Sequence, residues 1–182
     1  ERIAADRSPL TGLPGNNSIQ NTIEAVIKES DPYAIIYLDL DNFKAYNDAY
    51  GFASGDSMLK TLAQAMVKSC SDKDFIGHIG GDDFVIITRP RNKDSIQNLC
   101  ETVINNFAEM IQPLYSSEDW ERGYIISRDR NGFPDEFPIT TLSIAVVTNY
   151  DKHFAESSLL SQAIANVKKK CKQQYGNTII IT

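Results

Sequence analysis

The stretch that organises this chain runs from residue 75 to residue 88 and reads FIGHIGGDDFVIIT. Its two apolar parts, residues 75–79 and 84–88, have the length and the β-branched side chains of short strands. Between them lies GGDD at residues 80–83, and glycine accepts the positive φ angles that a tight turn requires. The stretch therefore predicts a β-hairpin with two carboxylates at its tip.

A second apolar run, at residues 33–38, is nearly continuous and β-branched, which is typical of a strand buried on both faces. It ends at Asp39, just before a short helix predicted at residues 43–50. A carboxylate at the end of a buried strand costs free energy unless it has a partner. If this strand lies beside the hairpin, Asp39 and Asp82 meet at one edge of the sheet, where a divalent cation relieves their repulsion.

Asp39 also allows a simpler interpretation, in which either it or Asp41 caps the following helix. An EF-hand loop that starts at Asp39 is excluded. Its sixth position would be Lys44 instead of glycine, and its twelfth would be Tyr50 instead of glutamate. The sequence thus leaves a helix cap and a shared metal site as the two interpretations of Asp39.

The same region offers groups that can bind phosphate. The backbone N–H groups of Asn42, Phe43 and Lys44 lie at the predicted helix N-terminus, which favours anions. Gly80 and Gly81 have no side chain to keep a phosphate away from the hairpin backbone. We therefore expect a metal-chelated phosphate at this edge of the sheet.

The rest of the chain alternates between helical and strand patterns. Apolar residues at helical spacing follow a predicted cap at Asn17 or Ser18 and recur at residues 56–70, 94–110 and 157–172, while further strands are predicted at 139–147 and 178–181. Residues 113–138 are loop-like, with one candidate strand at residues 124–127, and we expect an ordered surface hairpin there. The order predicts one α/β (α+β) domain whose central mixed, largely antiparallel five-stranded sheet is flanked by helices.

Two other features read as structural. His78 and His153 are isolated from other candidate ligands. The lysines at residues 168–170 and 172 form a basic run late in a helix, and for most of them we expect a solvated face that favours the helix dipole.

The composition excludes several classes of protein. The 182 residues fit one domain, and the net charge of −6 argues against a nucleic-acid or membrane-surface binder. Cys70, Cys100 and Cys171 are widely spaced and form no CxxC pair, which indicates neither a disulfide framework nor a zinc site and favours a reducing cytoplasm. No apolar run is long enough to cross a bilayer, and no signal peptide is found. Because the chain begins without Met, we expect a piece of a longer protein.

Six short motifs, in order and over nearly the whole chain, carry a resemblance to a known family. They are LTGLP at 10–14, DLDNFK at 39–44, ND at 47–48, GD at 55–56, GGDDF at 80–84 and TLSIA at 141–145. Together they resemble the GGDEF domain family of diguanylate cyclases. The resemblance implies a palm-like fold related to nucleotide cyclases and polymerases. It also implies a nucleotidyltransferase that condenses two GTP molecules into cyclic di-GMP in bacterial signal transduction.

The resemblance also implies a catalytic centre. Asp39, the carbonyl of Leu40 and Asp82 would hold Mg²⁺ or Mn²⁺. Asp82 and Asp83 would be the catalytic residues, with Asp82 assisting deprotonation of the attacking 3′-hydroxyl. Because metal ions lower the pKa of a bound hydroxyl and offset charge on the phosphate, this set suits attack on an α-phosphate.

Nucleotide recognition is implied in the same way. Asn47 and Asp56 would bond the guanine base, and Lys172 would meet the terminal phosphates. Since each domain would hold one GTP, two copies must face each other, which implies a homodimer during catalysis. The resemblance further implies that residues 1–182 form a single domain excised from a multidomain signalling protein, cytoplasmic and without direct membrane contact.

Four positions depart from the family pattern. Asp83 stands in place of the usual Glu, Phe52 in place of His, and Gly176 in place of a phosphate-binding Arg. Ser71 replaces the Arg of the product-inhibition site, so we expect that site to be absent. Two functions therefore stay open: an active diguanylate cyclase, or a degenerate domain that binds GTP and regulates an attached module without turnover. A third function, that of a cyclic di-GMP receptor, is disfavoured because Ser71 replaces the arginine that such a receptor would need.

Overall fold

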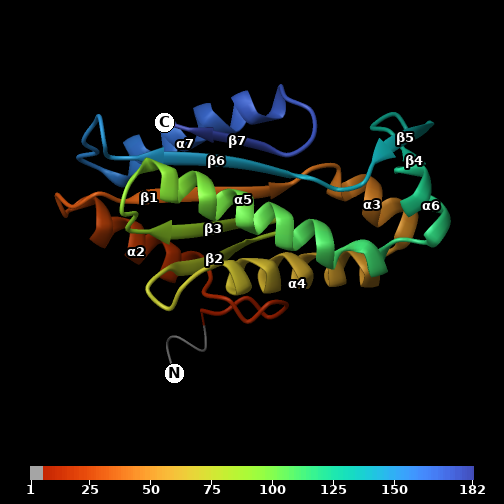
Figure 1. Ribbon diagram of the computed structural model, residues 1–182, viewed down its shortest axis with the longest axis horizontal. Helices are drawn as coiled ribbons and strands as arrows, with labels where there is room; N and C mark the ends of the chain where they lie inside the picture. The colour runs from red at the N-terminus through yellow and green to blue at the C-terminus, as the bar shows by residue number, and fades with distance from the viewer. Residues whose placement is uncertain (1–5) are drawn as a thin grey trace.

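A central five-stranded sheet organises the computed structural model, which describes residues 6–182 (Figure 1). Its strand order is β2-β3-β1-β6-β7. The strands are β1 Ala34–Leu40, β2 Phe75–Gly80, β3 Asp83–Thr88, β6 Leu142–Thr148 and β7 Thr178–Ile181. β1 runs antiparallel to both β3 and β6, whereas β7 runs parallel to β6. The predicted mixed, largely antiparallel sheet is confirmed.

Helices cover both faces of this sheet. They are α2 Asn16–Ile27, α3 Phe43–Tyr50, α4 Phe52–Ser69, α5 Lys93–Met110 and α7 Ser157–Lys172. α2 and α7 pack on one face, and α3, α4 and α5 pack on the other, so the chain buries two hydrophobic clusters (Figure 1). This arrangement explains why β1 is apolar on both sides.

The alternation of side chains along β1 decides where its aspartate points. Ile35 packs in the cluster beneath α2 and α7, and Ile36 packs in the opposite cluster. Successive strand residues face opposite sides, so Tyr37 and Asp39 share the face of Ile35. Asp39, near the end of the strand, therefore lies on the side that α7 covers.

Residues 112–138 are more ordered than predicted. They form a 3₁₀ turn Gln112–Leu114, α6 Ser117–Arg122, and a separate ribbon of β4 Tyr124–Arg128 with β5 Pro134–Pro138. The Oγ of Ser127 donates to the carbonyl of Ala45 at 2.6 Å, which holds the ribbon on α3. The expected surface hairpin is thus present, but describing this segment as loop-like was wrong.

The start of α2 also differs from the prediction. It begins at Asn16, and neither Asn17 nor Ser18 caps it with a side chain. Instead, the carboxylate of Asp6 accepts from the backbone N–H groups of Asn17 at 3.3 Å and Ser18 at 2.6 Å. The cap therefore comes from a residue ten positions before the helix, which local sequence cannot reveal.

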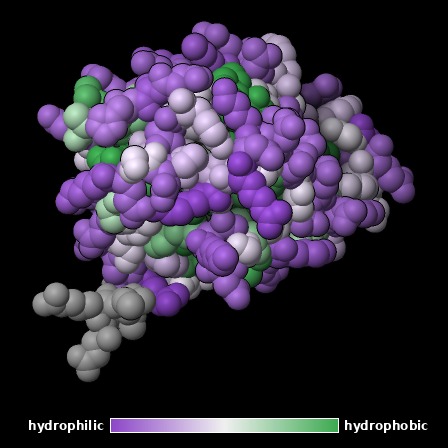
Figure 2. Space-filling view, turned by 60° about the vertical axis from the view of Figure 1, so that its left-hand side comes forward, coloured by the Kyte–Doolittle hydropathy of each residue, from purple (hydrophilic) through white to green (hydrophobic). Residues whose placement is uncertain are grey.

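The surface of the molecule is largely polar. The face in Figure 2 is mostly hydrophilic, and its apolar residues form small separate patches. The three cysteines are free. Among the helices of residues 6–182, none combines the length and apolar character needed to span a bilayer.

Candidate functional site

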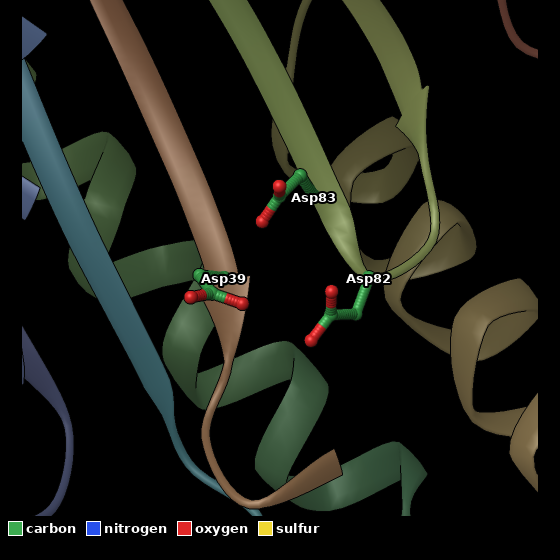
Figure 3. Close-up of side chains that lie close together, drawn as sticks. All are labelled: Asp39, Asp82 and Asp83. Atoms are coloured by element: carbon green, nitrogen blue, oxygen red, sulfur yellow. The ribbon is translucent and has the colours of Figure 1, made fainter. Parts of the chain in front are cut away.

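Three carboxylates meet at one edge of the sheet. Asp39 is the residue before the last of β1, Asp83 begins β3, and these two residues are register partners. Asp82 lies in the turn between β2 and β3, and all three side chains point into the same space (Figure 3). One carboxylate oxygen from each can be chosen so that all lie within 4.8 Å of one another. The predicted meeting of Asp39 and Asp82 is observed, and Asp83 joins them.

The hairpin that carries Asp82 depends on its glycines and on His78. Gly80 and Gly81 have φ angles of 103° and 56°, which side chains with a Cβ rarely adopt. His78 is buried, stacks on the ring of Phe84 and donates from Nε2 to the carbonyl of Gly81 at 3.0 Å. The Oγ of Ser8 bonds its other nitrogen at 2.8 Å. His78 is structural, as predicted, but it also fixes the turn of the site.

The electrostatics of the cluster favour a cation. Burial, and then the carboxylates of Asp39 and Asp83, raise the pKa of Asp82 from 3.8 to about 6. Burial also raises the pKa of Asp83, against the opposing effect of Lys168. At neutral pH these carboxylates repel one another, and hard oxygen ligands in close approach suit Mg²⁺ or Mn²⁺.

Two lysines of α7 approach the carboxylates. The Nζ of Lys172 lies 2.8 Å from Asp39 Oδ2 and 3.4 Å from Asp41 Oδ1. Burial alone would lower the pKa of Lys172, but these two carboxylates raise it. The Nζ of Lys168 lies 4.0 Å from Asp83 Oδ2. Lys169 and Lys170 are exposed, as expected for most of the run, whereas Lys168 is an exception, since a spacing of four residues places it beside Lys172 on one helix face.

Asp41 has a different role from a helix cap. Its carboxylate accepts from the hydroxyls of Thr141 and Ser143, each at 2.6 Å. The N-cap position of α3 is Asn42, in the left-handed region with φ 58°, and its side chain makes no capping bond. Neither Asp39 nor Asp41 caps α3, so the simpler interpretation of these residues was wrong.

The start of α3 lies directly beyond this edge. Leu40 is the last residue of β1, and Phe43 is the first of α3. The backbone N–H groups of Asn42, Phe43 and Lys44 belong to the cap and first turn, where a helix leaves such donors without intrahelical partners. The side chain of Lys44 extends into solvent and pairs with Asp48 at 3.0 Å.

The two predicted guanine ligands lie where α3 meets α4. Asn47 Oδ1 is buried and has no hydrogen-bond partner among the described residues. A Cβ on Gly55 would come within 1.6 Å of this oxygen, so the glycine leaves room for it. Asp56, the next residue, is exposed in α4. An orphaned buried oxygen beside an exposed carboxylate can recognise a polar ligand, because an unmade buried hydrogen bond costs free energy.

Three of the departures from the family pattern, Phe52, Ser71 and Gly176, lie at the surface, whereas Asp83 belongs to the carboxylate cluster. Phe52 is 81% exposed at the start of α4. Gly176 has a φ of 74°, which marks the turn between α7 and β7. None of these three residues places a charged side chain near the carboxylates.

Comparison with known proteins gives matches of two kinds. A family model described as "Diguanylate cyclase, GGDEF domain" matches residues 5–122. Cyclic di-GMP phosphodiesterase PdeR of Escherichia coli is 31% identical over 105 residues, or 57% of this chain and 16% of that protein. Diguanylate cyclase DgcZ of E. coli is 30% identical over 110 residues, or 57% of this chain and 37% of that protein. The chain thus spans well under half the length of both relatives.

Solved structures extend the likeness to the whole fold. Diguanylate cyclase SiaD of Pseudomonas aeruginosa, in complex with its activator SiaC, superposes with a TM-score of 0.74 at 22% identity, covering 100% of this chain and 63% of that one. The coiled coil and GGDEF domain of DgcB from Caulobacter crescentus gives 0.74 at 17% identity, covering 100% and 87%. At these identities the structures support the fold alone. They include the segment after residue 122, which the family model does not match.

Proposed function

Because the chain belongs to the diguanylate cyclase GGDEF domain family, we propose that it binds GTP with a divalent metal and condenses two GTP molecules into cyclic di-GMP. The observation that carries this proposal is the edge where Asp39, Asp82 and Asp83 converge beside Lys172 of α7. Such an edge binds a cation through its carboxylates and a polyphosphate through its ammonium group.

In this proposal Asp39, Asp82 and the carbonyl of Leu40 hold Mg²⁺ or Mn²⁺. The metal, when bound, neutralises phosphate charge and acidifies the attacking hydroxyl. The 3′-oxygen of one GTP attacks the α-phosphate of the other, forming a P–O bond as pyrophosphate leaves. Asp82 assists deprotonation of the attacking hydroxyl, toward which its carboxylate is placed at the tip of the hairpin.

The remaining groups orient the nucleotide. Asn47 and Asp56 bond the guanine, a role supported by the unpartnered oxygen of Asn47. Lys172 and the backbone N–H groups of Asn42, Phe43 and Lys44 bind phosphates, and Gly80 and Gly81 let them approach the hairpin. Each copy holds one GTP, so two copies must face each other with two-fold symmetry for turnover.

Two further parts of the proposal concern context. We assign the domain to the cytoplasm, as one module of a larger sensor protein, in keeping with relatives that are longer than this chain. We also propose that product inhibition is absent, because Ser71 stands where the product-inhibition site of the family has an arginine. Asp74, the acidic residue of the same turn, is already engaged by Ser71 and by the hydroxyl of Thr88.

A second candidate function is GTP binding without turnover, in regulation of an attached module. Asp83 favours it, since a side chain one methylene shorter than glutamate loses about 1.5 Å of reach. A misplacement of about 1 Å can cost two orders of magnitude in rate. Phe52 and Gly176, which remove polar groups that the family uses, favour it as well.

One assay separates the two functions. A dimerised form of the chain is incubated with GTP and Mg²⁺ or Mn²⁺, and products are separated by chromatography, with Asp82→Asn as the inactive control. A cyclic di-GMP peak that the control lacks supports the cyclase. No product with either metal, although calorimetry shows GTP binding, rejects the cyclase and leaves the regulatory function.

A further inference from the structure

Lys168 is a cation that faces the carboxylate cluster and that the proposed mechanism does not use. We propose that Lys168 binds the triphosphate of the nucleotide together with Lys172, so that α7 supplies two cations to this site. The inference rests on the proposed binding of GTP and adds to it the group that favours a triphosphate over a monophosphate.

The geometry places Lys168 at the site. It precedes Lys172 by one helical turn, so both side chains leave the same face of α7. Its Nζ lies 4.0 Å from Asp83 Oδ2 and 5.3 Å from the centre of the Tyr37 ring. Tyr37 precedes Asp39 by two residues on the same face of β1. The ring therefore holds the ammonium group over the sheet, close to the carboxylates.

The two lysines differ in how firmly the protein holds them. Lys172 makes ion pairs of 2.8 and 3.4 Å with two carboxylates. Lys168 makes one ion pair with the cluster, at 4.0 Å, and its side chain is 34% exposed. An ammonium group paired at that distance can turn to a phosphate oxygen without breaking a short ion pair. Of the two lysines, Lys168 is therefore the one whose ammonium group is held less tightly by carboxylates.

The charge of the site calls for a second cation. Asp39, Asp41, Asp82 and Asp83 carry four negative charges, against the two positive charges of the α7 lysines. A metal-chelated triphosphate adds roughly two negative charges, and unlike charges must offset them in a partly desolvated site. The chain continues after Lys172 as QQYGN at residues 173–177, without another cation. Lys168 is placed to provide the charge.

The test compares nucleotides that differ only in their phosphates. Calorimetry measures the affinities of GTP and GMP, with Mg²⁺ present, for the wild type and for Lys168→Met. Lys169→Met is the matched control, since it removes the same charge from an exposed position of the same helix. We expect Lys168→Met to weaken the affinity for GTP about tenfold and the affinity for GMP less than twofold. Lys169→Met should change neither affinity by more than twofold.

A second measurement separates phosphate binding from support of the fold. Titration with Mn²⁺ alone, followed by electron paramagnetic resonance, should show equal or tighter metal binding in Lys168→Met, because a positive charge beside the metal is removed. Lys168→Arg should keep the GTP affinity within about threefold. The inference would be overturned if Lys168→Met lost affinity for GTP and GMP equally, bound Mn²⁺ more weakly, or lost no affinity for GTP. A wild type that binds no GTP would instead reject the proposed function itself.

Discussion

Replacing Asp82 by asparagine should make the metal-free protein more stable while removing its capacity to bind a divalent cation. The side chain keeps its shape and loses its charge. In the native protein this charge lies partly buried beside two other carboxylates, and burial first, then these carboxylates, raise its pKa from 3.8 to about 6. The substitution thus removes a desolvation cost and a repulsion that the folded state bears and the unfolded state does not.

The size of the effect follows from the pKa. A rise from 3.8 to about 6 corresponds, at about 1.4 kcal/mol per pH unit, to about 3 kcal/mol as an upper limit. Solvent screens a partly exposed carboxylate, so we take about half of this, roughly 1.5 kcal/mol. For a chain of 182 residues, that gain corresponds to a rise in Tm of about 3–6 °C.

The pH dependence gives the effect its signature. Between pH 3.8 and about 6 the folded protein holds the Asp82 proton more tightly than the unfolded chain does. The contribution of the Asp82 carboxyl to the stability of the wild type is therefore fully present below pH 3.8 and is lost as the pH rises through about 6. Asparagine has no proton to lose. The advantage of Asp82→Asn should thus be largest near pH 8 and small near pH 4.

Thermal unfolding in EDTA at pH 8 and pH 4 measures this difference. Asp72→Asn, at an exposed position away from the cluster, is the matched control and should change Tm by less than about 2 °C. Adding Mn²⁺ should raise the Tm of the wild type but not that of Asp82→Asn. A variant that is no more stable at pH 8, or whose gain is the same at pH 4, would refute the electrostatic reasoning.

Three further substitutions test other parts of the site. Asp56→Ala should weaken GTP binding by about 1–3 kcal/mol, because guanine loses a charged acceptor; an unchanged affinity in calorimetry would mean that the guanine pocket is misassigned. Gly55→Ala should abolish GTP binding in the same assay, since its Cβ would lie 1.6 Å from Asn47 Oδ1; a retained affinity would speak against a role for Asn47. Asp83→Glu should raise the rate of cyclic di-GMP formation by restoring reach, and an equal or lower chromatographic yield would show a site adapted to the shorter acid.

The central strands could be predicted because their signals are local and strong. The run at residues 33–38 is apolar on both faces because both faces of β1 are covered. The two glycines of the hairpin predict the positive φ angles that the turn adopts. Once β1 and β3 are neighbours, the register brings Asp39 to Asp83 and close to Asp82.

The parts that escaped prediction depend on contacts between distant segments. Asp41 is held by two hydroxyls of the segment around β6, a hundred residues away. The orientation of Lys168 depends on how α7 turns about its own axis on the sheet, which its lysine-rich sequence does not disclose. The β4–β5 ribbon is short, and the bond from Ser127 to Ala45 helps hold it in place. The hairpin itself was expected, but periodicity over five residues is too weak a signal to locate its second strand, β5.

The most direct test of the central claim is calorimetric titration of GTP into the wild type with Mg²⁺ and again with EDTA. The claim concerns the edge formed by Asp39, Asp82 and Asp83, and it holds for both candidate functions. We predict binding with Mg²⁺ that weakens at least tenfold in EDTA, because the triphosphate then meets uncompensated carboxylates. Equal affinity under the two conditions, or no binding in either, would contradict the assignment of this edge as a metal–nucleotide site.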